Sequence, residues 1–154
     1  MKKVLSILGG IFLLLILVIA SLFGYVAYQG RGLDASSKDY VANNVPIILS
    51  TWSKDELLKR SSPQLLHVLN GEQGQLDQLF RKFSGLGALL SFGDIKGEAN
   101  ILYSAQYGKK TTASYIADAK FQNGEAKIIV RLILSPEGKW QFLLFRINSP
   151  LFIQ

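Results

Sequence analysis

Cysteine is absent from the 154-residue sequence, and His67 is its only histidine. Without cysteine the chain has no disulfide, no thiolate nucleophile and no N-terminal cysteine to carry a lipid. A zinc site needs several imidazole or thiolate ligands, and a nucleophile–histidine–carboxylate triad would depend on His67 alone. Because His67 stands in the apolar stretch LLHVLN, we interpret it as structural. We predict no metal, no cofactor and no catalytic residue.

Phosphate-binding motifs and runs of like charge are also missing. The glycines at positions 85, 87, 93 and 97 are not followed by the Gly-Lys-Ser/Thr ending of a phosphate-binding loop. The 17 Lys and Arg residues exceed the 11 Asp and Glu residues, which gives a formal net charge of +6. These cations are scattered, whereas nucleic-acid binders gather theirs into a patch or stripe, so we predict no nucleic-acid partner.

The sequence does contain one long apolar run, VLSILGGIFLLLILVIASLFGYVAY, over residues 4–28. As a helix it would be about 37 Å long, which exceeds the hydrocarbon core of about 30 Å. We predict a transmembrane anchor over residues 1–28. The alternative is a secretory signal cleaved after Ala20, but a signal turns polar after its cleavage site, and here the apolar residues continue.

The charges around this run predict its orientation. Lys2 and Lys3 precede it and only Arg31 follows closely, so the positive-inside rule places the N-terminus in the cytoplasm. We therefore expect a single-pass protein of the inner (plasma) membrane. Its remaining part, residues 36–154, would be a periplasmic or extracellular domain that follows a polar linker over residues 29–35.

The first half of this domain has helical periodicity and helix-start signals. A helix is predicted over 36–52, with Ser36 and Asp39 as a capping pair and a break or kink at Pro46. Further helices are predicted from a capping box at Ser53, from a cap at Ser62, and over 75–83.

The second half is rich in β-branched and aromatic residues, with strands predicted over 99–106, 111–121, 126–134 and 139–148. Asn123-Gly124 predicts a two-residue hairpin loop, which would set Ala117 opposite Val130 and Lys120 opposite Lys127. The turn SPEGK would set Leu134 opposite Trp140 and continue in register to Arg146 opposite Ile128. Helices followed by an antiparallel meander predict an α+β domain, with short helices packed on a curved sheet.

The order of these elements resembles the nuclear transport factor 2-like, or cystatin-like, α+β roll. The segments that carry the resemblance are YVANNVPIILSTW, GALLSFGDIKGEANILY and the closing GKWQFLLFRI. Small exported bacterial domains share such a closing strand, and VirB8-type secretion components also place one membrane helix before a roll. The resemblance covers residues 36–149 and implies a fold only, because this superfamily includes enzymes, binders and scaffolds.

Two groups of residues are candidate sites on this sheet. The first would line a concave pocket between helices and sheet: Trp52, Tyr103, Tyr115, Trp140 and Arg146. Its aromatic members are as well explained by core packing. A guanidinium on an apolar face needs a partner, so Arg146 either reaches solvent, pairs with a carboxylate or holds an anionic ligand.

The second group would lie on the outer sheet face, which is expected to carry an excess of large apolar residues. Its members are Ile116, Ile129, Arg131, Ile133, Leu143, Phe145 and Ile147. Exposed apolar patches usually mark interfaces, and residues 151–154 (LFIQ) would either extend this one or cover it. We predict a non-enzymatic, membrane-anchored domain that binds a protein partner or a second copy through this face, as a scaffold or assembly subunit of an envelope complex. The alternative is a small-ligand-binding or enzymatic roll that uses the pocket near Arg146.

Overall fold

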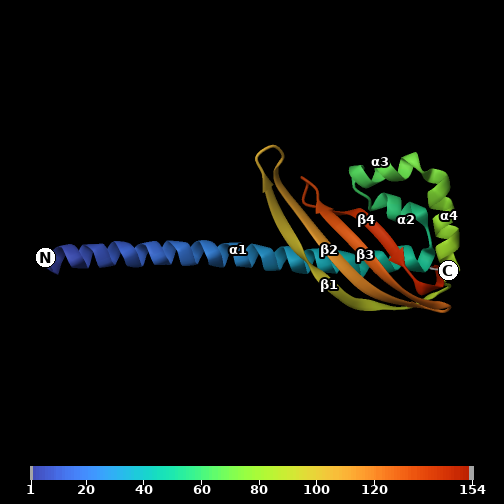
Figure 1. Cartoon of the computed structure of the whole chain (residues 1–154), viewed down its shortest axis with the longest axis horizontal. Helices are drawn as coiled ribbons and strands as arrows, with labels where there is room; N and C mark the ends of the chain where they lie inside the picture. Colours follow the sequence, from blue (N-terminus) through green and yellow to red (C-terminus); the bar gives the residue numbers. More distant parts are fainter. Residues whose placement is uncertain (1, 153–154) are drawn as a thin grey trace. The chain divides into compact units, whose positions relative to one another are not determined.

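The computed structural model describes residues 2–152 and has an α+β architecture (Figure 1). It begins with one long helix, α1 (Lys2–Thr51), and the chain divides into two compact units, residues 1–33 and 34–154. Within the described residues, α1 from Gly10 onwards is the one helix long and apolar enough to span a membrane. Its most apolar window has a mean hydropathy of 2.6 and is not buried.

Helix α1 continues through both places where we expected the helix to be interrupted, the segment 29–35 and Pro46. Residues 29–35, expected to form a linker, are helical, and Ser36 lies inside α1 rather than at its start. Pro46 does not end the helix either. A proline inside a helix costs about 3 kcal/mol. The neighbours of Pro46 offset this cost, because Val45 and Ile48 are almost completely buried in the core.

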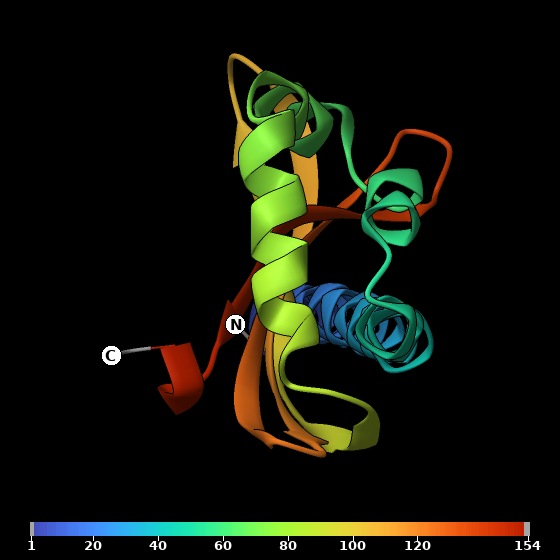
Figure 2. The same cartoon turned by 90° about the vertical axis from the view of Figure 1, so that its right-hand side faces the viewer.

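Three short helices follow: α2 (Lys54–Lys59), α3 (Pro63–Gly71) and α4 (Gln73–Ser84). Ser62 caps α3 as predicted, since its side chain accepts a hydrogen bond from the Leu65 N–H. Ser53 precedes α2 without making the predicted side-chain cap, and the Glu56 carboxylate pairs with Arg60 at 2.5 Å instead of returning to the Ser53 N–H. In Figure 2, α4 crosses in front of the strands, joined to the end of α1 through α2 and α3.

The sheet is an antiparallel meander in the order β1 (Leu89–Ser104), β2 (Gly108–Phe121), β3 (Gly124–Leu134) and β4 (Trp140–Asn148). A short 3-10 helix, η1 (Pro150–Phe152), follows. β1 begins ten residues earlier than predicted. We missed its first half because it contains two glycines and two register irregularities.

The predicted β2–β3 register was wrong by two residues, although every residue is on the face we predicted. Ala117 lies opposite Ile128, and the loop is Gln122-Asn123 rather than Asn123-Gly124. The N–H groups of Gln122 and Asn123 bond to the Ala88 and Leu86 carbonyls, so the preceding chain holds this turn. The observed register also replaces the predicted Lys–Lys pair by two ion pairs, Lys120–Glu125 and Lys127–Asp118.

The predicted β3–β4 register holds for three pairs and then fails at a bulge. Leu134 is opposite Trp140 and Leu132 is opposite Phe142, as expected, but Arg131 is opposite Leu144. One extra residue in β4 moves every later side chain of the strand to the opposite face of the sheet. Arg146 therefore lies on the outer face, whereas Phe145 and Ile147 turn inward to line an apolar pocket with leucines and phenylalanines of α2, α3 and α4.

The core lies between the inner sheet face and the second-unit part of α1. It contains Val41, Val45, Ile48 and Leu49 from α1 and Ala113, Ala117, Ala119, Ile128, Val130, Leu132 and Phe142 from the strands. The alanines of β2 leave room for the helix to approach. At the C-terminal end, the Phe152 ring lies 5.4 Å from the Phe83 ring of α4, and residues 153–154 lie outside the described residues.

Candidate interaction surface

Two of the aromatic residues predicted for a concave pocket, Tyr115 and Trp140, are core residues with satisfied polar atoms. The buried hydroxyl of Tyr115 lies 2.8 Å from the Ser37 hydroxyl and donates to the Asp34 carbonyl at 3.1 Å. Trp140 donates its indole N–H to the Ser36 hydroxyl at 3.1 Å. Burial raises the pKa of Tyr115, against the Ser37 hydrogen bond, which lowers it. These contacts attach the first turn of the second unit to β2 and β4.

Trp52 belongs to the opposite end of the core. It follows the last residue of α1 with a φ of +47°, a left-handed conformation that is costly for a residue with a side chain. Its indole N–H donates to the Gly87 carbonyl at 3.1 Å, and its ring lies 5.4 Å from that of Phe121. These contacts hold the strained turn, so Trp52 has a structural explanation.

The other two predicted pocket residues are not in the interior. Tyr103 is 77% exposed near the end of β1, and Arg146 is exposed on the outer face because of the bulge. The structure therefore does not bring the five predicted pocket residues together. The apolar pocket behind Phe145 and Ile147 has a volume of only about 100 Å³.

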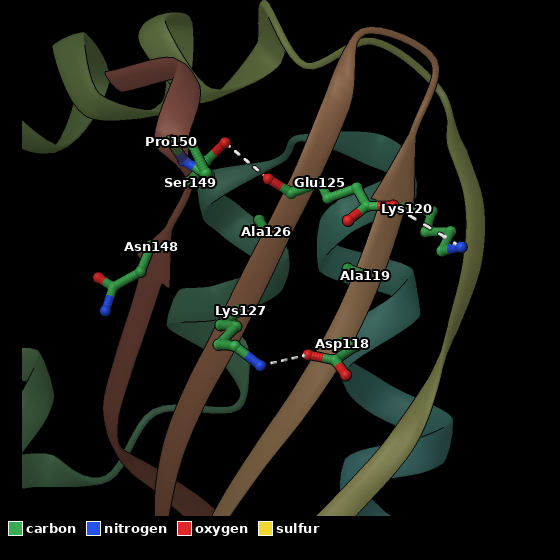
Figure 3. A pocket seen from close by; sticks show the side chains of 9 residues that line it. All are labelled: Asp118, Ala119, Lys120, Glu125, Ala126, Lys127, Asn148, Ser149 and Pro150. Atoms are coloured by element: carbon green, nitrogen blue, oxygen red, sulfur yellow. Dashed lines mark hydrogen bonds and ion pairs between the residues drawn. The ribbon is translucent and has the colours of Figure 1, made fainter. Parts of the chain in front are cut away.

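A larger depression, of about 420 Å³, lies along the β2–β3 hairpin beside η1 (Figure 3). Its charged side chains neutralise one another: Lys127 lies 2.9 Å from Asp118, and Lys120 lies 3.6 Å from Glu125. The Ser149 hydroxyl donates to the Glu125 carbonyl at 2.7 Å and fixes η1 against the hairpin. All four charged side chains that line the depression, Asp118, Lys120, Glu125 and Lys127, are thus paired with one another.

The outer sheet face differs from the prediction in which apolar residues it carries. Ile116 is 47% exposed and Ile129 is half-buried beside it, as predicted. Ile133 is 8% exposed, and it lines a small depression together with Pro63 and Gln64 at the start of α3. Phe145 and Ile147 belong to the inner side, and Leu143 is the half-buried residue at the bulge.

The middle of the outer face is a cluster of four residues, Ile116, Ile129, Arg131 and Arg146, which we call the outer cluster. The pairing sets Lys96, Ile116, Ile129 and Arg146 in one row across all four strands. Arg131 lies two residues along β3 from Ile129 and therefore projects from the same face. Both arginine side chains belong to exposed residues.

The cations of this face fall into two classes. Lys96 lies 2.8 Å from Asp94, and the hydrogen bond between them raises the pKa of Lys96 and lowers that of Asp94. Lys120 and Lys127 are likewise paired with carboxylates. Within residues 2–152, Arg131 and Arg146 have no carboxylate within salt-bridge distance. The sequence placed Arg131 on this face, but no sequence signal revealed the bulge that adds Arg146.

His67 is exposed on α3. In the described part of the chain, no three His, Asp or Glu side chains come together as metal ligands. Comparison of the chain with models of known protein families, with curated proteins and with solved structures finds no significant match.

Proposed function

We propose that the chain is a membrane-anchored, non-enzymatic domain that binds another protein, or a second copy of itself, through the outer cluster. The observation that carries this proposal is a pair of arginines that have no ion pair within residues 2–152, beside the exposed Ile116 and the half-buried Ile129. Interface centres are enriched in arginine and apolar residues and depleted in lysine. Three lysines of this sheet face, Lys96, Lys120 and Lys127, already have carboxylate partners.

The charge of the cluster indicates the chemistry of its partner. Arg131 lies two residues along β3 from Ile129, and Arg146 lies opposite Ile129 on β4. A complementary surface would therefore offer two carboxylates next to an apolar residue. Guanidinium groups bind carboxylates through two parallel hydrogen bonds, which fixes orientation as well as adding affinity. A partner of this kind suits a scaffold or assembly subunit of an envelope complex.

The proposal also includes a cellular location and a fold superfamily for the chain. The charge distribution around the apolar part of α1 supports a cytoplasmic N-terminus and a periplasmic or extracellular domain. The order of helices and meander supports a nuclear transport factor 2-like or cystatin-like roll. A ligand-binding roll required Arg146 inside the sheet, and since Arg146 lies outside, we do not propose that function.

The test is crosslinking of the full chain in native membranes, followed by affinity purification. We expect a crosslinked species of defined mass. The double variant Arg131→Glu/Arg146→Glu should reduce it at least tenfold, because loss of a hot-spot residue costs about 2 kcal/mol or more, about thirtyfold in affinity. Lys139→Glu, which changes an exposed cation in the β3–β4 turn, should leave it unchanged.

Circular dichroism of the purified full-length variants in detergent checks that each one is folded. The proposal fails if the wild-type chain crosslinks to nothing. It also fails if the folded double variant retains the crosslinked species at the wild-type level.

A further inference from the structure

Large side chains at the turn between β1 and β2 are exposed and do not contribute to the core of the domain. Leu102, Tyr103 and Tyr107 are 59%, 77% and 78% exposed, respectively. The core ends before them, because Thr111 is the last buried residue of β2 toward this turn. Leu102 and Tyr103 follow each other in β1 and so project from opposite faces of the hairpin. We call residues 102–110 the hairpin tip.

The hairpin tip is positively charged, and the sequence around it contains no acidic residue. Lys109 and Lys110 are exposed, and no Asp or Glu occurs from residue 99 to residue 117. Tyrosine is enriched at the boundary between lipid and water, where its ring is apolar and its hydroxyl is hydrated. Lysine next to such residues lies along the apolar surface and keeps its ammonium group among anionic headgroups.

The tip also lies at the end of the domain where the chain enters it. Asp34 is the first residue of the second unit, and its carboxylate accepts a hydrogen bond from the Ala99 N–H at 2.6 Å. Trp52, at the other end of this helical segment, packs on Phe121 at the far end of β2. The hairpin therefore extends beyond the position of Asp34, at the end of the domain where the chain enters it.

The lengths of the two segments are compatible with contact at a bilayer surface. From Ala99 to Ser104, β1 continues for five residues, or about 17 Å at strand spacing. From Tyr28, the last residue of the apolar run, to Asp34 is six helical residues, or about 9 Å. The hairpin beyond Ala99 is thus longer than the segment that separates the domain from the apolar run.

We propose that the hairpin tip binds the surface of an anionic lipid bilayer, with Tyr103, Tyr107 and Leu102 at the headgroup level and Lys109 and Lys110 on lipid phosphates. This gives the domain a second attachment beside α1. The inference rests on the membrane anchoring in the proposed function, and it is independent of protein binding through the outer cluster.

The absence of cysteine makes a direct test possible in the full chain. Single cysteines replace Gln106 in the tip, Gln122 in the β2–β3 turn and Ser21 in the apolar part of α1. Gln106 and Gln122 are both exposed turn residues, and the two turns lie at opposite ends of the 14-residue strand β2. Each cysteine is labelled with an environment-sensitive fluorophore. The proteins are reconstituted in phosphatidylcholine vesicles containing phosphatidylglycerol.

Quenching then distinguishes lipid from water around each label. A nitroxide near the headgroup end of an acyl chain should quench the labels of Ser21→Cys and Gln106→Cys, but not that of Gln122→Cys. Aqueous iodide should quench the label of Gln122→Cys more strongly than that of Gln106→Cys. In Gln106→Cys, adding Lys109→Gln/Lys110→Gln should reduce the ratio of docked to undocked tips about 25-fold, at about fivefold for each lysine. Pure phosphatidylcholine should reduce it similarly.

Three outcomes would overturn the inference, each for a separate reason. If the Ser21→Cys label is not quenched by the nitroxide lipid, α1 does not span the bilayer, and both the anchoring and the inference fail. If that label is quenched while Gln106→Cys behaves like Gln122→Cys, the tip is in water and only the inference fails. If the Gln106→Cys label is shielded from iodide without nitroxide quenching, the tip is covered by protein rather than by lipid.

Discussion

The two faces of the sheet differ in what their residues do for the fold. On the inner face, alanines of β2 and branched residues of β3 pack under α1, and the two polar aromatic residues there direct their polar atoms to Ser36 and Ser37. On the outer face, charged residues surround Ile116 and Ile129, and two arginines have no ion pair within residues 2–152. The inner face therefore specifies the structure, while the outer face carries cationic side chains that make no ion pair within the described residues.

The largest contrast is expected between neighbouring residues of β3 that project from opposite faces. Val130 is 2% exposed, so Val130→Asp would bury an unpaired carboxylate, which costs several kcal/mol and should unfold the domain. Ile129→Asp on the outer face should cost only about 1–2 kcal/mol, because the side chain there is half-buried. Denaturant unfolding of the full chain in detergent, followed by circular dichroism, measures both. Equal losses would show that the faces are assigned wrongly.

A second contrast lies within β1. A Cβ on Gly97 would come within 1.9 Å of the Ser114 carbonyl oxygen, and the residue has a φ of +153°. Gly97→Ala should therefore destabilise the domain by about 2–3 kcal/mol. Gly93→Ala is the matched control, because a Cβ there meets nothing within 4 Å. Similar melting temperatures for the two variants would contradict the β1–β2 pairing at Gly97.

A smaller effect is expected at the polar contacts of the inner face. Tyr115→Phe removes the hydroxyl that contacts Ser37 and Asp34, at a cost of about 1–2 kcal/mol. Burial raises the pKa of Tyr115 in the folded state, so its contribution is complete below the unfolded pKa of about 10 and is lost as the pH rises further. Above that pH, the wild-type chain should lose stability more steeply than Tyr115→Phe. Parallel pH profiles would contradict this assignment.

The smallest effect is expected away from both faces, at the end of α2. Hydrogen bonds from Arg60 and Lys59 lower the pKa of Glu56, so its contribution is present above the unfolded pKa and is lost as the pH falls through the lower, folded one. Glu56→Gln should therefore melt slightly below the wild-type chain at neutral pH and should converge with it in acid. Asp55→Asn removes a neighbouring exposed carboxylate as a control. A difference that persists in strong acid would rule out the ionic explanation.

Sequence reasoning predicted the features that depend on the alternation of apolar and polar residues along a strand. It missed the features that depend on tertiary contacts. Strands two to four and the faces of β2 and β3 follow from period-two patterning, which survives a register error of two residues. The bulge at Leu143 has no local signal, because it is favoured by the apolar space that α4 leaves for Phe145 and Ile147. That single irregularity decided which side of the sheet received Arg146, and with it the composition of the candidate site.

Helix α1 is also the first element of the domain to be synthesised, and one of its partners is among the last. The bond between Ser36 and Trp140 joins residues 104 positions apart. At about 5–20 residues per second, the ribosome needs about 5–20 s to make that stretch. Throughout this time the apolar side of the helix, including Val41 and Val45, has no completed sheet to cover it. A nascent chain that stops before β4 therefore exposes the apolar side of α1. Folding of the domain thus depends on completion of its own translation.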